Sequence, residues 1–145
     1  MDKTKILYTS EELRLHAEKL ALCLQSYDNI LFVMNASFML CRDLIPVISH
    51  KTLIHFWKPK TCSRAPIIKG SVALVDTLFD TGATRKILFE TYPRDSEYFC
   101  LVSKRFDTPF VFDPLPAPDT FLYGYGLDDK NNKRTAIRNM VYDIL

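Results

Sequence analysis

Residues 71–84 bring acids, hydroxyls and a glycine together; they read Ser-Val-Ala-Leu-Val-Asp-Thr-Leu-Phe-Asp-Thr-Gly-Ala-Thr. The apolar run 72–75 has the character of a buried parallel strand, which we expect to end near Asp76, and Arg85–Glu90 can continue as a helix. Backbone N–H groups in a turn between a strand and a helix point at a bound anion, and the helix dipole favours negative charge there. The sequence therefore predicts a phosphate site at residues 80–84.

The side chains of this stretch suit different parts of a sugar phosphate. Gly82 allows close backbone approach, Thr81 and Thr84 can donate hydroxyl hydrogen bonds, and Ala83 contributes its backbone N–H. Asp76 and Asp80 would repel a bare phosphate, so they suit ribose hydroxyls, a metal ion or a proton to be accepted. An ordinary strand-to-helix loop with Asp80 or Thr81 as the N-cap is the alternative interpretation.

The elements that position this stretch alternate between strand and helix. Thr9 and Glu12 form a capping box, and apolar residues at helical spacing follow it. We expect helices at 10–24, 38–45 (stopped by Pro46) and 85–90, strands at 30–34, 53–57, 71–75 and 98–103, an extended edge segment at 110–118, a glycine-kinked strand at 121–128 and an amphipathic or strand-like segment at 136–145. This order predicts a single α/β domain, residues 1–145, with a mainly parallel twisted sheet flanked by helices.

Composition narrows the classes of protein. The chain has 145 residues, 48% hydrophobic and 25% charged, with a net charge of +2, so a globular domain is expected and nucleic acid is an unlikely partner on charge alone. No apolar run reaches membrane-span length and no signal peptide precedes the first helix, which predicts a cytoplasmic protein without a membrane partner. Neither the three histidines nor the cysteines Cys23, Cys41, Cys62 and Cys100 have metal-ligand spacing, so free thiols are expected.

The order hydrophobic-hydrophobic-Asp-x-x-x-Asp-Thr-Gly-x-Thr at residues 74–84 resembles the phosphoribosyl diphosphate (PRPP) signature of the type I phosphoribosyltransferases, with the hypoxanthine-guanine branch closest. In that branch two adjacent acids hold the ribose hydroxyls. Here Asp76 is the first and Thr77 occupies the second position, so one carboxylate is missing.

Residues 121–128, Phe-Leu-Tyr-Gly-Tyr-Gly-Leu-Asp, are similar to a second motif of the same branch, which an arginine follows six residues later. The resemblance implies that Phe121 stacks on a purine and that the backbone of Leu122 contacts the base edge. It places Asp128 beside Mg²⁺ and brings Arg134 to the diphosphate. Lys104, after the strand at 98–103, would donate to the exocyclic oxygen of a 6-oxopurine.

Two loops depart from the branch. Asn35, Ala36 and Ser37 stand where it commonly has Lys-Gly-Gly, so Asn35 can donate an amide hydrogen bond to diphosphate but neutralises no charge. The segment between residues 57 and 71 is short for the lid that closes over the site in this family. Its basic stretch, Lys58, Lys60 and Arg64, is either a solvated surface or a holder of anionic substrate.

The resemblance implies an enzyme of purine salvage that joins PRPP and a 6-oxopurine into a nucleoside monophosphate and diphosphate. Asp80 would accept the proton near the purine N7, residues 81–84 would hold the 5′-phosphate, and Asp76 with Thr77 would face the ribose. Mg²⁺ would bind mostly through substrate oxygens, with Asp128 nearby. Members of the family often pair, so a homodimer or homotetramer is considered, and preference among hypoxanthine, guanine and xanthine is left open.

Two other functions are compatible with the sequence. A nucleotide-binding or regulatory module without turnover would explain the departures at Thr77, Asn35 and the lid. A nucleic-acid-binding regulator on the same scaffold would use Lys130, Lys133, Arg134 and Arg138.

Overall fold

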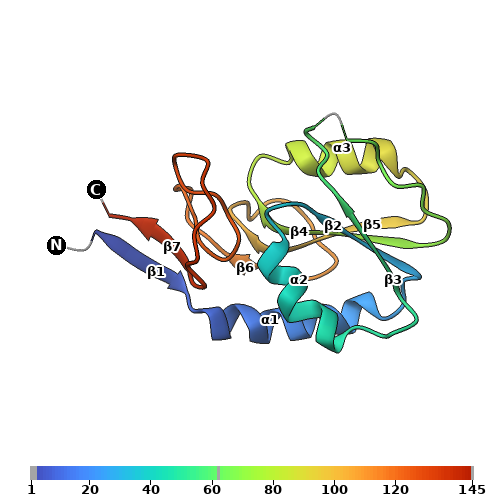
Figure 1. The fold of residues 1–145 in the computed structure, drawn as a ribbon, viewed down its shortest axis with the longest axis horizontal. Helices are drawn as coiled ribbons and strands as arrows, with labels where there is room; N and C mark the ends of the chain where they lie inside the picture. Colours follow the sequence, from blue (N-terminus) through green and yellow to red (C-terminus); the bar gives the residue numbers. More distant parts are fainter. Residues whose placement is uncertain (1–2, 62, 145) are drawn as a thin grey trace.

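The structure, a computed structural model, describes residues 3–61 and 63–144 and has a five-stranded sheet at its centre (Figure 1). The strand order is β3-β2-β4-β5-β6, and every neighbouring pair is parallel. The strands are β2 (Asn29–Val33), β3 (Leu53–Trp57), β4 (Val72–Phe79), β5 (Ser96–Ser103) and the two-residue edge strand β6 (Leu115–Pro116). The expected α/β class with a mainly parallel sheet is confirmed.

Helices cover both faces of this sheet, as Figure 1 shows. On one face lie α1 (Ser10–Leu24), which begins with the expected Thr9–Glu12 capping box, and α2 (Phe38–Leu44). On the other face lies α3 (Ala83–Thr91). Each face buries its own apolar cluster, the first including Leu20 and Phe32 and the second including Leu74 and Leu88. The sheet is thus enclosed on both sides, as the apolar runs of its strands require.

A separate two-stranded sheet lies at one end of the molecule. It pairs β1 (Thr4–Tyr8) antiparallel with β7 (Met140–Asp143), so segments from the two ends of the described chain lie side by side (Figure 1). The sequence did not predict β1 as a strand, because its five residues show little burial to mark a pattern.

Three expectations about the central region are wrong in their boundaries. β4 does not end near Asp76 but continues to Phe79, because Asp76, Leu78 and Phe79 remain paired with β5. Neither Asp80 nor Thr81 is the N-cap of α3; Gly82 is, with φ 89°. The helix after β2 ends at Leu44, and Pro46 lies in a 3₁₀ turn, Ile45–Val47, rather than directly after an α-helix.

Residues 121–128 do not form the expected kinked strand. Gly124, Tyr125 and Gly126 have φ values of 80°, 50° and 90°, so the chain curls instead of extending. Isolated bridges hold the curl: Tyr123 pairs with Val141, and Gly124 pairs with Leu127. Residues 121–128 are therefore a loop supported by β7.

The thiols of Cys23, Cys41 and Cys100 are free, and Cys62 lies outside the described residues. Within the described ranges, no helix combines the length and apolar character needed to cross a bilayer.

Candidate functional site

A cleft of about 500 Å³ opens at the carboxyl ends of the central strands. Its lining comes from five parts of the chain: residues 33–36, residues 58–60, residues 76 and 78–85, Tyr98, and residues 126–128 together with Arg134. Because parallel strands present their carboxyl ends at the same edge of a sheet, this is where such folds place ligands. The cleft brings most of the predicted site residues together.

The turn between β4 and α3 forms one wall of the cleft. No side chain caps α3, and Thr81 Oγ1 accepts from the N–H of Ala83 at 3.3 Å. A Cβ atom at Gly82 would lie 3.3 Å from the ring of Phe79, and the positive φ disfavours any side chain there. The uncapped N–H groups of the first turn and the hydroxyls of Thr81 and Thr84 therefore suit an anion in the cleft.

Asp76 is a buried acid on the floor of the cleft. It is 6% exposed, and its carboxylate accepts from the Thr77 N–H at 2.8 Å and from Tyr98 Oη at 3.3 Å. Burial raises the pKa of Asp76 from 3.8 to about 6, although the two hydrogen bonds and the charge of Lys60 oppose the shift. Near neutrality this carboxyl therefore gains or loses a proton readily when a neighbouring charge changes.

Asp80 lies at the carboxyl end of β4, where the end of β5 holds it. Lys104 Nζ is 3.2 Å from Asp80 Oδ2, and Arg105 Nε donates to the Asp80 carbonyl oxygen at 2.8 Å. The Lys104 side chain is 7% exposed and that of Asp80 is 47% exposed. The pair therefore offers a ligand an accessible carboxylate backed by a buried ammonium group.

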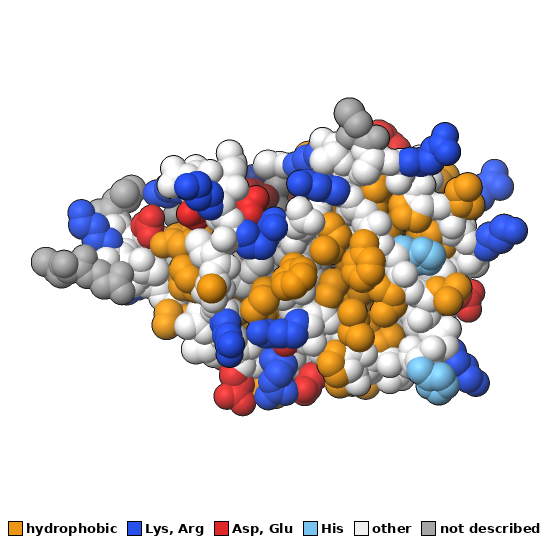
Figure 2. Space-filling model, in the orientation of Figure 1, with side chains coloured by type: hydrophobic (Ala, Val, Ile, Leu, Met, Phe, Trp, Pro, Cys, Tyr) orange, Lys and Arg blue, Asp and Glu red, His pale blue; other side chains and the backbone are white. Residues whose placement is uncertain are grey.

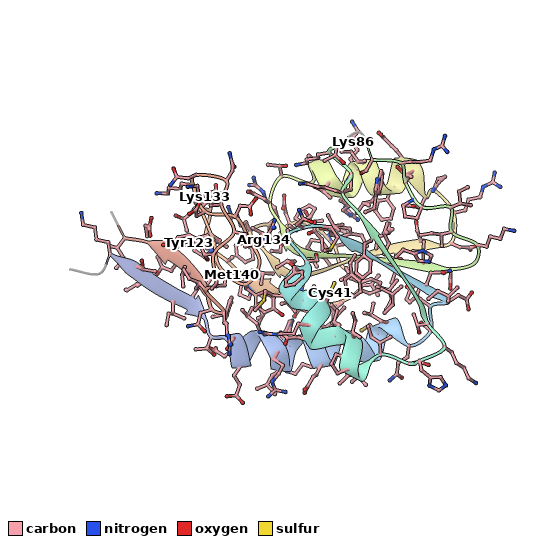
Figure 3. The ribbon with its side chains drawn as sticks, viewed as in Figure 1. Cys41, Lys86, Tyr123, Lys133, Arg134 and Met140 are labelled. Carbon is pink, nitrogen blue, oxygen red and sulfur yellow. The ribbon has the colours of Figure 1, made fainter. Side chains whose placement is uncertain are left out.

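Asp128 and Arg134 line another part of the cleft. Arg134 Nη2 lies 3.2 Å from Asp128 Oδ1, and Arg134 Nε donates to the carbonyl oxygen of Gly126 at 3.3 Å. Figure 3 shows Arg134 on the loop next to β7, facing the central part of the molecule. The described residues contain no cluster of three His, Cys, Asp or Glu side chains able to hold a metal. A single carboxylate at Asp128 fits a Mg²⁺ ion that keeps water and substrate oxygens as its other ligands.

Thr77, which was predicted to contact the ligand, does not reach the cleft. It is fully buried, and its hydroxyl donates to the Ala36 carbonyl oxygen at 3.1 Å and lies 3.3 Å from Ser37 Oγ. Adjacent residues of a strand point to opposite faces, so the side chain next to Asp76 projects to the other face of the sheet. Thr77 instead fixes the loop that carries Asn35, which does line the cleft.

The residues predicted to bind a purine are less closely grouped. Lys104, Phe121 and Leu122 do not line the cleft, but Lys104 contacts Asp80, which does. The side chain of Leu122 is buried in the core, and the ring of Phe121 packs against Tyr123 with centroids 6.3 Å apart. The role predicted for Leu122 is a contact between its backbone and the base edge, and it stays a prediction.

Among the polar side chains of the cleft, sequence reasoning missed two and left two others undecided. Arg85 and Tyr98 were assigned only to a helix and a strand, and Lys58 and Lys60 only to a basic stretch; all four line the cleft, whereas Arg64 does not. Arg85 could have been found from its position in the first turn of α3, directly after the turn at 80–84. Nothing in the sequence of β5 marks Tyr98 as a cleft residue.

The sequence matches no family model and has no significant match among curated proteins. Solved structures are similar over nearly the whole chain. A hypoxanthine-guanine phosphoribosyltransferase from Bacillus anthracis superposes with a TM-score of 0.79 at 20% identity, covering 96% of this chain and 98% of that one. Hypoxanthine phosphoribosyltransferase from Trypanosoma cruzi, in complex with the product IMP, gives 0.73 at 23% identity with coverages of 97% and 90%. HGPRT-ase from Leishmania tarentolae in complex with GMP gives 0.77 at 17% identity with coverages of 99% and 98%. The chain therefore has the type I phosphoribosyltransferase fold, in the form taken by the hypoxanthine-guanine enzymes.

Proposed function

We propose that the protein is a phosphoribosyltransferase that joins PRPP and a 6-oxopurine to give a nucleoside monophosphate and diphosphate. The observation that carries the proposal is the cleft itself, in which the phosphate turn at 80–84, the acids Asp76 and Asp80, and the Asp128–Arg134 pair face one space. The fold shared with hypoxanthine-guanine enzymes supports the same reaction class.

Each wall then has a separate task. The turn at 80–84 binds the 5′-phosphate, and Asp76 accepts a hydrogen bond from a ribose hydroxyl. Asp128 and Arg134 hold the diphosphate end, where Mg²⁺ would supply charge neutralisation when bound to substrate oxygens. A purine nitrogen forms the new bond to C1′ while the bond from C1′ to diphosphate breaks. Orientation and stabilisation of the leaving diphosphate provide most of the rate.

The Asp80–Lys104 pair handles the purine. Lys104 donates to the exocyclic oxygen, which draws electron density from the ring, and Asp80 accepts the proton near N7. A purine entering the site replaces their direct 3.2 Å contact with one hydrogen bond to each partner. The buried ammonium group thereby exchanges one polar partner for another, which keeps the cost of breaking the pair low.

One observation favours a second candidate, a nucleotide-binding module without turnover. Of the usual adjacent pair of acids only Asp76 is present, because Thr77 takes the second position and faces away from the cleft. Asn35 lines the cleft but carries no positive charge. Such a module would bind a nucleoside monophosphate at the turn and release no diphosphate from PRPP.

The association of two copies forms part of the proposal. Side chains exposed on α2 and the edge strand β3, including Phe38, Leu53 and Phe56, are hydrophobic. Figure 2 shows hydrophobic side chains gathered on the face that α2 and β3 occupy in Figure 1. A patch of this kind is typical of a surface buried between proteins.

Diphosphate release from PRPP and Mg²⁺, with hypoxanthine, guanine or xanthine as acceptor, tests the proposal. We expect purine-dependent release, and a fall in kcat of about 10²-fold or more in Asp80→Asn, the usual loss of a general base. Asp119→Asn, an exposed carboxylate outside the cleft, is the matched control. Unchanged turnover in Asp80→Asn would contradict the role of Asp80.

Binding measurements on the same preparations separate the alternatives. Tight binding of GMP or IMP without any diphosphate release would support the module without turnover. Binding to RNA or DNA that weakens steeply with salt would support the nucleic-acid regulator instead.

A further inference from the structure

Three cations that line the cleft form no ion pair with an acid among the described residues. Lys58 and Lys60 directly follow β3, and Arg85 lies in the first turn of α3. Among the described residues, no ion pair within 4.0 Å joins any of these three to an acid. Arg134, which also lines the cleft, is paired with Asp128, and Lys104 is paired with the cleft residue Asp80, both at 3.2 Å. Positive charge is therefore in excess on the side formed by β3 and α3.

Arg85 is held in place but not satisfied. Its guanidinium packs over the rings of Phe89 and Tyr98, with the central carbon 5.1 Å and 5.8 Å from the two centroids. Its Nε atom is the one buried side-chain nitrogen in the described part of the chain that lacks a hydrogen-bond partner. A buried unpaired N–H costs free energy, and a guanidinium oriented by two rings is ready to bind an anion with little loss of freedom.

Asp76, the acid that Tyr98 connects to Arg85, does not supply the missing partner. Asp76 is buried, and its two oxygens already accept from Thr77 N–H and Tyr98 Oη. The ring face of Tyr98 contacts the Arg85 guanidinium, and the hydroxyl group of the same residue donates to Asp76. An anion from outside the chain is thus the natural partner for Arg85.

We propose that Lys58, Lys60 and Arg85 form a diphosphate subsite of this protein and supply most of its positive charge, beside the contact made by Arg134. The inference rests on the proposed function and assigns to three residues the charge that the loop at 35–37 lacks. Diphosphate carries several negative charges and many acceptor oxygens, which suits two mobile ammonium groups and one oriented guanidinium better than a single monophosphate would. Arg85 also adjoins the turn at 80–84, so one sugar could place its 5′-phosphate on the turn and its diphosphate on this subsite.

Calorimetric titration of the full chain with two probes tests the subsite. Inorganic diphosphate reports on the cations, and ribose 5-phosphate reports on the turn. We expect Arg85→Gln to weaken diphosphate binding at least tenfold and to change ribose 5-phosphate binding less than twofold. Lys60→Gln should act in the same direction, and Arg85→Lys should restore part of the diphosphate affinity because it keeps the charge.

Lys86→Gln is the matched control. It removes the same charge from the next residue of α3, but Lys86 is exposed and does not line the cleft (Figure 3). We expect less than a twofold change with either probe, and circular dichroism confirms that each variant is folded.

The outcomes separate this inference from the proposed function. Equal diphosphate affinity in Arg85→Gln, Lys60→Gln and the unmodified chain would overturn the subsite. Ribose 5-phosphate that fails to bind, or that binds unchanged in Thr84→Val, would count against the phosphate turn and hence the proposed function. A loss of diphosphate binding confined to Arg85→Gln and Lys60→Gln would support the subsite whichever result the sugar phosphate gives.

Discussion

At Asp76, an acid of the proposed site occupies a place that disfavours its charge. The carboxyl is 6% exposed, and burial raises its pKa to about 6, against an ordinary value of 3.8. Two hydrogen bonds from Tyr98 and Thr77 limit this shift without abolishing it. Buried acids with a raised pKa are common in binding and catalytic sites, where they lower the stability of the fold.

We expect Asp76→Asn to be more stable than the unmodified protein at pH 7. Below about pH 3.8 the folded and unfolded carboxyls are both protonated, so no penalty applies. As the pH rises toward 6 the unfolded carboxyl ionises first and the protein loses stability, to a full cost of about 3 kcal/mol above pH 6. Asparagine does not ionise, so urea unfolding at pH 7 should show a gain approaching this size, and at pH 4 little gain.

Asp119→Asn serves as the control for this prediction, since Asp119 is exposed and outside the cleft. Its unfolding free energy should follow that of the unmodified protein at both pH values. A gain in Asp76→Asn that is equal at pH 4 and pH 7 would show that burial of charge is not its cause.

The sequence predicted which residues face the site only where a local backbone feature, such as a glycine in a turn, determines their position. The Asp-Thr-Gly-x-Thr order predicted the turn before α3, because a glycine of positive φ before a helix is a local property. The opposite orientations of Asp76 and Thr77 could not be predicted, because they depend on where β4 ends, three residues later than the first acid suggested. Arg85 was missed because its two aromatic partners are contributed by separate elements, α3 and β5.

Among the elements, the loop at 121–128 depends most on its neighbours. Tyr123 exchanges backbone hydrogen bonds with Val141 of β7 at 3.0 and 2.9 Å, and the same loop carries Asp128 to the cleft. A Cβ atom at Gly124 would collide with the carbonyl oxygen of Asn139, and φ there is 80°. The placement of Asp128 and Arg134 therefore depends on close backbone contact beside β7.

We expect Gly124→Ala to weaken PRPP binding about tenfold, because small misplacement of binding groups is costly. It should also lower the free energy of unfolding by about 1 kcal/mol or more, since alanine is strained at positive φ. Gly70→Ala is the control: φ is 94° and a Cβ would lie 2.7 Å from Asp28 Oδ2, in the loop that leads into β4, away from the cleft. Titration with PRPP should distinguish them, and equal binding by both variants would refute the role of the loop.

Elements with a local signal were predicted well, and those defined by pairing were not. The capping box and spacing of α1 predicted its bounds, Ser10–Leu24, and the apolar run of β3 predicted Leu53–Trp57. β1 was missed because its partner β7 lies at the other end of the described chain, and the 121–128 segment was misassigned because its aromatic residues favour a strand while its glycines take positive φ.

At the scale of the whole molecule, the cleft and the exposed hydrophobic face meet at the start of α2. Asn35 and Ala36 line the cleft just before α2, while Phe38, the first residue of α2, and Phe56 on β3 are 59% and 51% exposed. Phe56 stacks on Phe32, on the sheet face that α1 and α2 cover, with centroids 6.0 Å apart. Pairing of two copies through this face would therefore restrain the same helix that follows Asn35.

We expect sedimentation at micromolar concentration to show a dimer, and Phe56→Glu to convert it to a monomer. A carboxylate at the centre of an apolar, two-fold interface would be buried against its own symmetry copy, where like charges repel. Ile67→Glu is the control, because Ile67 is 89% exposed and lies in the connection between β3 and β4. Dissociation in Ile67→Glu as well would indicate nonspecific association, and a dimer that survives Phe56→Glu would place the interface elsewhere. If restraint of α2 supports the cleft, the monomeric variant should also bind PRPP more weakly while remaining folded.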